Sequence, residues 1–147
     1  MKIIVDTNII FSVLLNTDGN ISDVLFNSDG VFEFYSCSYM RHEIEKHWEK
    51  LKRISKLSED ELEESRFYVY SKIGFIDEAL IPEKTWLAAE KIVENIDADD
   101  VDFIALTMHL KGFLWTRDKQ LYRGLKKKSF KRVYNTKELQ TLRKAKS

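Results

Sequence analysis

The chain has 147 residues, of which 44% are hydrophobic and 33% are charged. This length fits one domain, and the composition is that of a globular protein and excludes a disordered chain. No apolar run approaches the roughly 18 residues of a membrane span, and the apolar stretch after Lys2 is too short for a signal peptide. The single Cys37 cannot form an internal disulfide, which agrees with a reducing compartment. We therefore expect a cytoplasmic protein that does not enter a membrane.

The formal net charge of zero hides an asymmetry along the chain. Residues 1–110 carry 11 Lys and Arg against 22 Asp and Glu, whereas residues 111–147 carry 13 against 2. The basic segment from about residue 126 includes Lys126, Lys127 and Lys128, and it is a candidate surface for contacts with phosphates. Taken alone, this segment is more simply interpreted as a solvated tail that balances charge.

Short apolar segments alternate with amphipathic ones. In chain order we expect strand 2–5, helix 7–15, helix 22–27, strand 31–37, helix 38–54, helix 58–72, strand 75–76, helix 82–95, helix 97–110, strand 113–116, helix 118–125, edge strand 132–134 and helix 136–145. Ser38 is expected to cap the third helix, and Ser58 with Glu61 to form a capping box. The alternation predicts an α/β fold, with residues 1–147 in one three-layer α/β/α domain around a mainly parallel sheet.

Two of the expected strands run straight into a carboxylate. Residues 2–5 are followed by Asp6, and residues 113–116 are followed by Arg117 and Asp118. Because ligands of open parallel sheets bind at the carboxyl ends of strands, we expect both acids to lie near a site. Carboxylates gathered at one edge repel each other and raise each other's pKa unless a cation relieves them. Such a cluster points to Mg²⁺ or Mn²⁺, which prefer oxygen ligands.

Four segments, in this order and spacing, resemble the PIN domain family over nearly the whole chain. They are Val-Asp-Thr-Asn at 5–8, Tyr-Met-Arg-His-Glu-Ile at 39–44, Asp-Ala-Asp-Asp-Val-Asp-Phe-Ile-Ala-Leu at 97–106 and Trp-Thr-Arg-Asp at 115–118. The resemblance implies the fold of many metal-dependent ribonucleases. It assigns the family's catalytic and metal-binding acids to four positions, Asp6, Glu43, Asp100 and Asp118, which would hold one or two Mg²⁺ or Mn²⁺ ions.

Two of these assignments have competitors. Three further acids crowd around Asp100 in the sequence: Asp97, Asp99 and Asp102. Asp97, three residues before Asp100, would share its helical face and could give a further ligand directly or through water. Glu45 competes with Glu43, but a step of two residues turns a helical side chain by about 200°, so only one of the two can face the site. The resemblance favours Glu43.

Polar and basic residues beside the acids are candidates for supporting roles. Asn8 and Ser12 lie one turn apart on the first helix and Thr116 precedes the last acid, so all three could orient the carboxylates. The alternatives are that Asn8 caps its helix and that Ser12 and Thr116 are purely structural. Arg117 and Lys119 border the last acid and, with the three lysines from residue 126, are candidates for binding RNA phosphates.

The resemblance implies a ribonuclease, with RNA preferred to DNA. Metal ions held by the four acids would activate a water, neutralise the scissile phosphate and stabilise the leaving 3′ oxygen. The family includes toxins of VapBC-like toxin–antitoxin pairs, so the resemblance implies an antitoxin that inserts an Arg or Lys side chain into the acidic cleft. It also implies a homodimer, for which we nominate residues 38–72 as the interface. The alternative function is a PIN-like module that no longer cleaves and only binds RNA or protein.

Four aromatic residues fall at helical spacings in the middle of the chain: Phe67, Tyr68, Tyr70 and Trp86. We expect them in the core or at a dimer face rather than as platforms for stacking bases.

Overall fold

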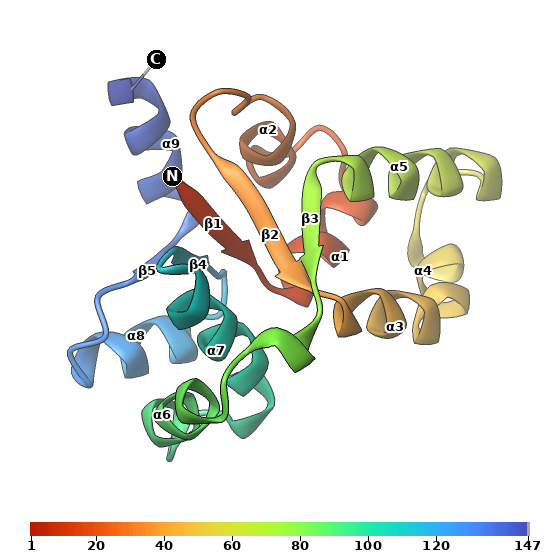
Figure 1. Cartoon of the computed structure of the whole chain (residues 1–147). Helices are drawn as coiled ribbons and strands as arrows, with labels where there is room; N and C mark the ends of the chain where they lie inside the picture. The colour runs from red at the N-terminus through yellow and green to blue at the C-terminus, as the bar shows by residue number, and fades with distance from the viewer. Residues whose placement is uncertain (147) are drawn as a thin grey trace.

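The computed structural model describes residues 1–146, with the side chains of all of these except Ala98. Its strands are β1 (Lys2–Val5), β2 (Glu33–Cys37), β3 (Ile73–Ile76), β4 (Phe113–Trp115) and β5 (Val133–Tyr134). Within the described residues they form one five-stranded sheet in the order β3-β2-β1-β4-β5, and every neighbouring pair is parallel (Figure 1). Ser147, the last residue of the expected domain 1–147, lies outside the described residues. The expected α/β fold with a parallel sheet is confirmed.

The helices that connect these strands lie close to their expected positions. They are α1 (Thr7–Leu15), α2 (Asn20–Phe26), α3 (Tyr39–Lys46), α4 (Trp48–Ile54), α5 (Glu59–Ser71), α6 (Glu83–Val93), α7 (Val101–Leu110), α8 (Lys119–Lys127) and α9 (Thr136–Lys146), with the short 3₁₀ helices η1 (Glu78–Leu80) and η2 (Ala98–Asp100). The expected helix 97–110 thus begins with the 3₁₀ turn η2, which precedes α7.

The sheet separates two apolar clusters because successive residues of a strand point to opposite faces. On β1, Ile3 and Val5 belong to one cluster and Ile4 to the other; on β4, Trp115 belongs to the first and Leu114 to the second. Residues of α1, α2, α5 and α9 pack in the first cluster, and residues of α6, α7 and α8 pack in the second. The sheet is therefore covered on both faces, as buried parallel sheets require, in the expected α/β/α arrangement.

The strand order reverses direction at β1, and this reversal positions the site. The chain places β2 on one side of β1 and β4 on the other, so the connections leave the carboxyl ends of β1 and β4 toward opposite faces. Open α/β sheets bind ligands in the crevice at such a point. Val5 pairs with Trp115 in the sheet, and the next residues, Asp6 and Thr116, therefore leave the two strands side by side.

The single helix expected over residues 38–54 is wrong in two respects. The chain breaks it at His47 (φ −101°, ψ 11°), which separates α3 from α4. Ser38 does not cap α3, because its own backbone is helical and its side chain makes no capping hydrogen bond. The backbone N–H of Tyr39 instead donates to Oε1 of Glu78, at 2.8 Å, from a distant part of the chain.

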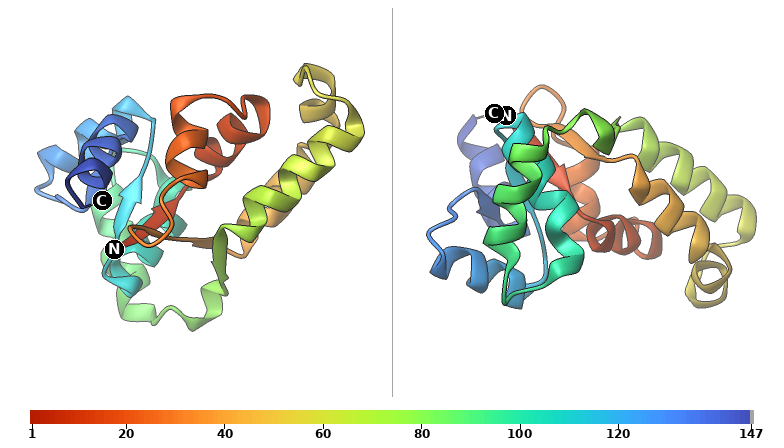
Figure 2. Two further views of the ribbon diagram at one scale, coloured as in Figure 1. Left: turned by 90° about the horizontal axis from the view of Figure 1, so that it is seen from above. Right: turned by 60° about the horizontal axis from the view of Figure 1, so that its bottom comes forward.

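Helices α3, α4 and α5 form an arm that projects from the sheet (Figure 2). The expected capping box is present at the start of α5, where the Ser58 hydroxyl accepts from the N–H of Glu61 and the Glu61 carboxylate accepts from the N–H of Ser58. Tyr70 is half-buried, but Phe67 and Tyr68 are 72% and 54% exposed, so these two do not belong to the core.

Among residues 1–146 no single helix is long and apolar enough to cross a membrane. Helices α1 and α2 reach that length and apolarity only as a pair bent by 106°, and their buried apolar residues belong to the core.

Candidate metal centre

Asp6 leaves the sheet at its centre. It follows β1 and is the N-cap of α1, where its Oδ1 accepts a hydrogen bond of 2.9 Å from the backbone N–H of Ile9. The residue is only 4% exposed and lines a cavity of about 420 Å³. A carboxylate that caps a helix gains from the partial positive charge of the helix N-terminus, which lowers the free-energy cost of burying it here.

Asp118 occupies the equivalent position after β4. It is the N-cap of α8, and its Oδ1 accepts from the N–H of Gln120 at 3.0 Å and of Leu121 at 3.1 Å. The buried hydroxyl of Thr116 accepts from the N–H of Asp118 at 3.1 Å and donates to the carboxylate of Asp6. Thr116 thus links the two acids that end the central strands.

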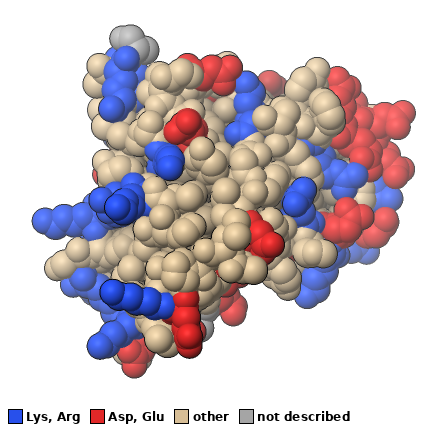
Figure 3. Space-filling view, in the orientation of Figure 1, with Lys and Arg blue, Asp and Glu red and all other residues tan. Residues whose placement is uncertain are grey.

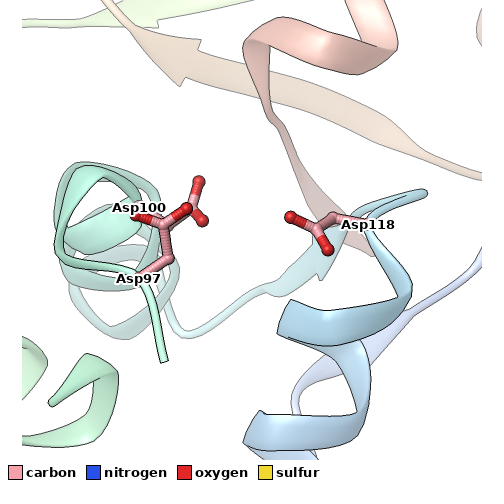
Figure 4. Close-up of side chains that lie close together, drawn as sticks. All are labelled: Asp97, Asp100 and Asp118. Carbon is pink, nitrogen blue, oxygen red and sulfur yellow. The ribbon is translucent and has the colours of Figure 1, made fainter. Parts of the chain in front are cut away.

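Asp97 and Asp100 approach these acids from the turn before α7. The N–H of Asp100 donates to the backbone oxygen of Asp97 at 3.3 Å, and Oδ1 of Asp97 accepts from the N–H of Asp99 at 3.0 Å. Carboxylate oxygens of Asp97, Asp100 and Asp118 lie within 4.8 Å of one another, and Figure 4 shows the first two facing the third. Unlike Asp6 and Asp118, Asp100 makes no side-chain hydrogen bond as the N-cap of its helix.

Burial and mutual repulsion raise the pKa of two of these acids. Burial raises the pKa of Asp6 to about 6, although the hydrogen bonds from Ile9 and Thr116 lower it. Burial, followed by the charges of Asp97, Asp6 and Asp118, raises the pKa of Asp100 to about 7. Near neutral pH a cation would therefore relieve the repulsion within the cluster. Carboxylate oxygens that repel one another are suitable ligands for Mg²⁺ or Mn²⁺, so the residues present fit the expected metal ions.

Glu43 stands apart from the close group of three but lines the same cavity as Asp6 and Asp100. It lies on α3 and is half-buried. Glu45 is exposed and accepts from Arg66 at 3.0 Å on another side of the helix. Glu43, rather than Glu45, therefore faces the cavity, as the turn of the helix predicts.

His47 is a neighbour of the site that the sequence reasoning missed. Its Nε2 lies 3.8 Å from Oε2 of Glu43, and its ring makes an edge contact with Phe11 at 5.8 Å between centroids. The spacing of four residues between Glu43 and His47 is the signal that could have found this pair. The His47 ring therefore lies beside the Glu43 carboxylate, at a distance longer than a hydrogen bond.

The polar residues expected around the acids lie close to them. Asn8 is exposed and lines the cavity of Asp6; the alternative that it caps α1 is wrong, because Asp6 is the cap. The Ser12 hydroxyl donates to the backbone oxygen of Asn8 at 2.9 Å and accepts from Nη1 of Arg117 at 2.5 Å. Arg117 is thus held against α1, where its charge also lowers the pKa of Asp6.

The residues expected to contact phosphates lie on α8 or next to its ends: Arg117, Lys119, Lys126, Lys127 and Lys128. Figure 3 shows Lys and Arg gathered over α8 and α9, and Asp and Glu gathered at the far end of the arm. Two of the lysines have protein partners. The ammonium of Lys128 donates to the backbone oxygens of Lys91 and Glu94, and that of Lys126 lies 5.4 Å from the centroid of the Tyr122 ring.

Two acids that competed for the metal site differ in position. Asp99 is exposed, and Asp102 is half-buried with its pKa raised by burial and by the charge of Glu78. Both line the cavity of Asp6, but neither belongs to the close group of carboxylates among the described residues.

The raised pKa values predict that the metal-free protein loses stability as the pH rises. Below about pH 4 the Asp6 carboxyl is protonated in both states; between about pH 4 and 6 the folded protein keeps a proton that the unfolded chain has lost, so folding weakens. Asp100 extends the loss to about pH 7. The rise in the Asp6 pKa from 3.8 corresponds to about 3 kcal/mol. Urea unfolding with chelator at about pH 4 and about pH 8 measures the loss of stability.

Asp6→Asn should lose less stability than the wild type over this range, because it lacks the titrating carboxyl of Asp6 while Asn still caps the helix; the loss that Asp100 contributes remains. Asp60→Asn, at an exposed position of α5, is the matched control and should behave as the wild type. An equal loss of stability in Asp6→Asn and wild type would contradict the raised pKa assigned to Asp6.

The chain shares its fold and its sequence pattern with known proteins. No curated protein matches the chain by sequence. Among solved structures, the chain is similar to VapBC2 from Rickettsia felis bound to a DNA fragment from their promoter, with a TM-score of 0.68 and 14% identity over 92% of this chain and 98% of that chain. At this identity the likeness concerns the fold. The sequence profile described as "PIN domain" matches residues 4–143, and the chain therefore belongs to the PIN domain family.

Proposed function

We propose that this protein is a divalent-metal-dependent ribonuclease that hydrolyses RNA phosphodiester bonds. The observation that carries the proposal is the convergence of Asp97, Asp100 and Asp118, beside the buried Asp6, at the carboxyl ends of β1 and β4. The raised pKa of Asp100 supports a site that needs a cation. Membership of the PIN domain family supports nuclease chemistry at that site.

The carboxylates would hold the ion, and the rest of the chain would hold the carboxylates. Asp97, Asp100 and Asp118 are the ligands nearest to one another, with Asp6 and Glu43 completing the wall of the site. One or two bound Mg²⁺ or Mn²⁺ ions would supply the charge that neutralises the scissile phosphate and promotes ionisation of the attacking water. In the reaction the water would lose a proton as its oxygen bonds to phosphorus, and the bond to the 3′ oxygen would break, leaving a 5′ phosphate and a 3′ hydroxyl that has taken up a proton.

Contacts within the chain hold the acids and Arg117 in position before a substrate binds. Asp6 and Asp118 are fixed by the helices that they cap and by Thr116 between them. Ser12, held by the backbone of Asn8, keeps Arg117 at the rim of the site. A guanidinium in that place can bind a phosphate next to the one that is cut. Lys119 and the lysines 126–128 would then contact the RNA backbone farther away.

Cleavage of a mixed single-stranded RNA, with Mn²⁺ or with chelator, tests the proposal. Wild type should cleave with Mn²⁺ and stop with chelator. Asp6→Asn should cleave more than about 100-fold more slowly, because it removes a charge from the wall of the metal site but keeps the helix cap. Asp60→Asn makes the same chemical change at an exposed position of α5 and should retain full activity.

Equal cleavage by wild type and Asp6→Asn would contradict the nuclease assignment, because a contaminating enzyme would then account for the activity. If neither protein cleaves RNA but both bind it in a salt-sensitive manner, the result would support the alternative of a non-cleaving RNA-binding module.

We further propose that the protein is the toxin of a cytoplasmic toxin–antitoxin pair. The support is the shared fold with VapBC2 of Rickettsia felis, together with the acidic cavity. An antitoxin would insert an Arg or Lys side chain among the carboxylates and so occupy the place of the metal ions. This part of the proposal requires an antitoxin partner. If no such partner binds the protein, the proposed ribonuclease activity is unaffected.

The arm is the surface that we assign to a homodimer. Phe67 and Tyr68 lie together on α5 with ring centroids 6.1 Å apart, and Phe67 is 72% exposed. Exposed apolar patches of this kind mark interaction sites. We therefore expect the protein to sediment as a dimer and Phe67→Glu to sediment as a monomer in analytical ultracentrifugation. Leu87→Glu, at a 59% exposed position of α6, should leave the dimer unchanged; a monomeric wild type would contradict the assignment.

A further inference from the structure

Asp97 reaches the metal centre from a turn, and burial does not hold it there. The turn runs from Glu94, the C-cap of α6, to Asp97, which precedes η2 and α7. Asp97 is exposed, and among the described residues its carboxylate accepts one hydrogen bond, from the N–H of Asp99. Its oxygens nevertheless lie within 4.8 Å of those of Asp100 and Asp118. The position of Asp97 therefore depends on the backbone of residues 94–97, which we call the Asp97 turn.

The backbone of the Asp97 turn needs contacts from outside. Asn95 has a φ of 68°, in the left-handed region, which costs free energy for residues other than Gly and persists where the surrounding structure holds it. The N–H of Ile96 donates to the backbone oxygen of Val93 at 2.8 Å. The last backbone oxygens of a helix lack partners within that helix, so those at the end of α6 need donors from elsewhere.

Lys128, the C-cap of α8, supplies these donors. Its ammonium donates to the backbone oxygen of Lys91 at 3.4 Å and to that of Glu94. The first oxygen belongs to the last turn of α6, and the second belongs to the Asp97 turn itself. A cation is also favoured at this end of a helix, which carries a partial negative charge. One side chain therefore holds both the end of α6 and the start of the Asp97 turn against α8.

A close contact on the same face of α8 sets how near the Asp97 turn can lie. Gly124 precedes Lys128 by four residues, so the two positions face the same side of the helix. A Cβ at position 124 would lie 3.0 Å from Cδ1 and from Cγ1 of Ile96, which is closer than ordinary van der Waals contact. Glycine thus allows Ile96, the residue before Asp97, to pack directly on the backbone of α8.

We propose that Lys128 is a positioning residue of the metal centre, because it holds the Asp97 turn against α8 and so places Asp97 opposite Asp118. Asp118 caps the start of the same helix, and Figure 4 shows it facing Asp97. Helix α8 therefore carries one acid at its N-terminus and fixes the other acid through its C-terminal end. This inference rests on the proposed metal site. It gives Lys128 a role in addition to the contact with RNA phosphates.

Titration calorimetry with Mn²⁺ alone tests this inference without RNA. Lys128→Ala should weaken Mn²⁺ binding about tenfold, as the loss of an outer partner of a metal site does. Charge alone predicts the opposite sign, because removal of a cation favours the binding of another cation nearby. Lys128→Arg can still donate to both backbone oxygens and should recover most of the wild-type affinity.

The matched control is Lys131→Ala, which removes the same charge at an exposed position three residues farther along the chain. This variant should bind Mn²⁺ at least as tightly as wild type. A double-mutant cycle then shows whether Lys128 acts through Asp97. Asp97→Asn should weaken Mn²⁺ binding by itself, and the addition of Lys128→Ala should cause little further loss.

Hydrogen exchange of backbone amides, measured with chelator, reports on the Asp97 turn in the absence of metal. The N–H of Ile96 should exchange about tenfold faster in Lys128→Ala than in wild type, because the turn opens locally when a hydrogen bond from a charged group is lost. The N–H of Leu106, which is buried on α7, should exchange at the wild-type rate.

Four results would overturn the inference: wild-type Mn²⁺ affinity in Lys128→Ala, an equal loss in Lys131→Ala, no recovery in Lys128→Arg, or a full further loss when Lys128→Ala is added to Asp97→Asn. Unchanged exchange at Ile96 would overturn it as well. A wild type that binds no Mn²⁺ would instead contradict the proposed function, and faster exchange at Ile96 in Lys128→Ala would then still show that Lys128 holds the Asp97 turn.

Discussion

Repulsion among carboxylates at the reversal point of the sheet is the constraint on which the rest of the structure depends. The fold relieves part of this repulsion by itself, because Asp6 and Asp118 each cap a helix and share Thr116. Asp100 has no such capping bond, and its pKa is raised to about 7. The protein can fold with this strain because the sheet and its two apolar clusters are built from residues other than the acids. A divalent cation bound at this place would relieve the remaining repulsion among the carboxylates.

The same constraint organises the surface around the site. In the proposed function, the carboxylate cluster would repel RNA, so the substrate would have to be attracted by other residues and neutralised locally. The chain separates these tasks along its length: acids reach the site from α1, α3 and the start of α7, while cations follow from Arg117 onward. Asp118 belongs to both parts, since it faces Asp97 and Asp100 on one side and lines the concavity between α1, α2, α8 and α9 on the other.

Much of the site could be predicted because its acids are bound to local patterns. Asp6 and Asp118 follow apolar strands directly, and the reversal of strand order at β1 places them side by side. The spacing of Asp97 to Asp100 was enough to suggest that both act together. The features that were missed depend on distant partners. Glu78 lies 39 residues from the Tyr39 N–H that it accepts from, and Arg117 lies 105 residues from Ser12.

The break at His47 shows the same limit on a smaller scale. No Gly or Pro lies at this break, so the sequence predicts one continuous helix. In the structure the N–H of His47 still donates to the backbone oxygen of Glu43, so the helical hydrogen bonds of α3 continue up to the break. The packing of the His47 ring on Phe11, from a helix on the other side of the cavity, could not be read from the helix alone. Likewise, the concavity of about 1070 Å³ beside Asp118 exists only when α1 and α2 lie opposite α8 and α9.

Anomalous scattering from crystals grown with Mn²⁺ tests the central claim most directly. An ion should appear among the carboxylate oxygens of Asp97, Asp100 and Asp118, at about 2.1 Å from its ligands as for other small divalent ions that prefer oxygen. Asp100→Asn crystals should lose most of this density. Mn²⁺ density elsewhere in the protein, or none at these oxygens at saturating Mn²⁺, would contradict the claim that the carboxylates converge to hold a metal.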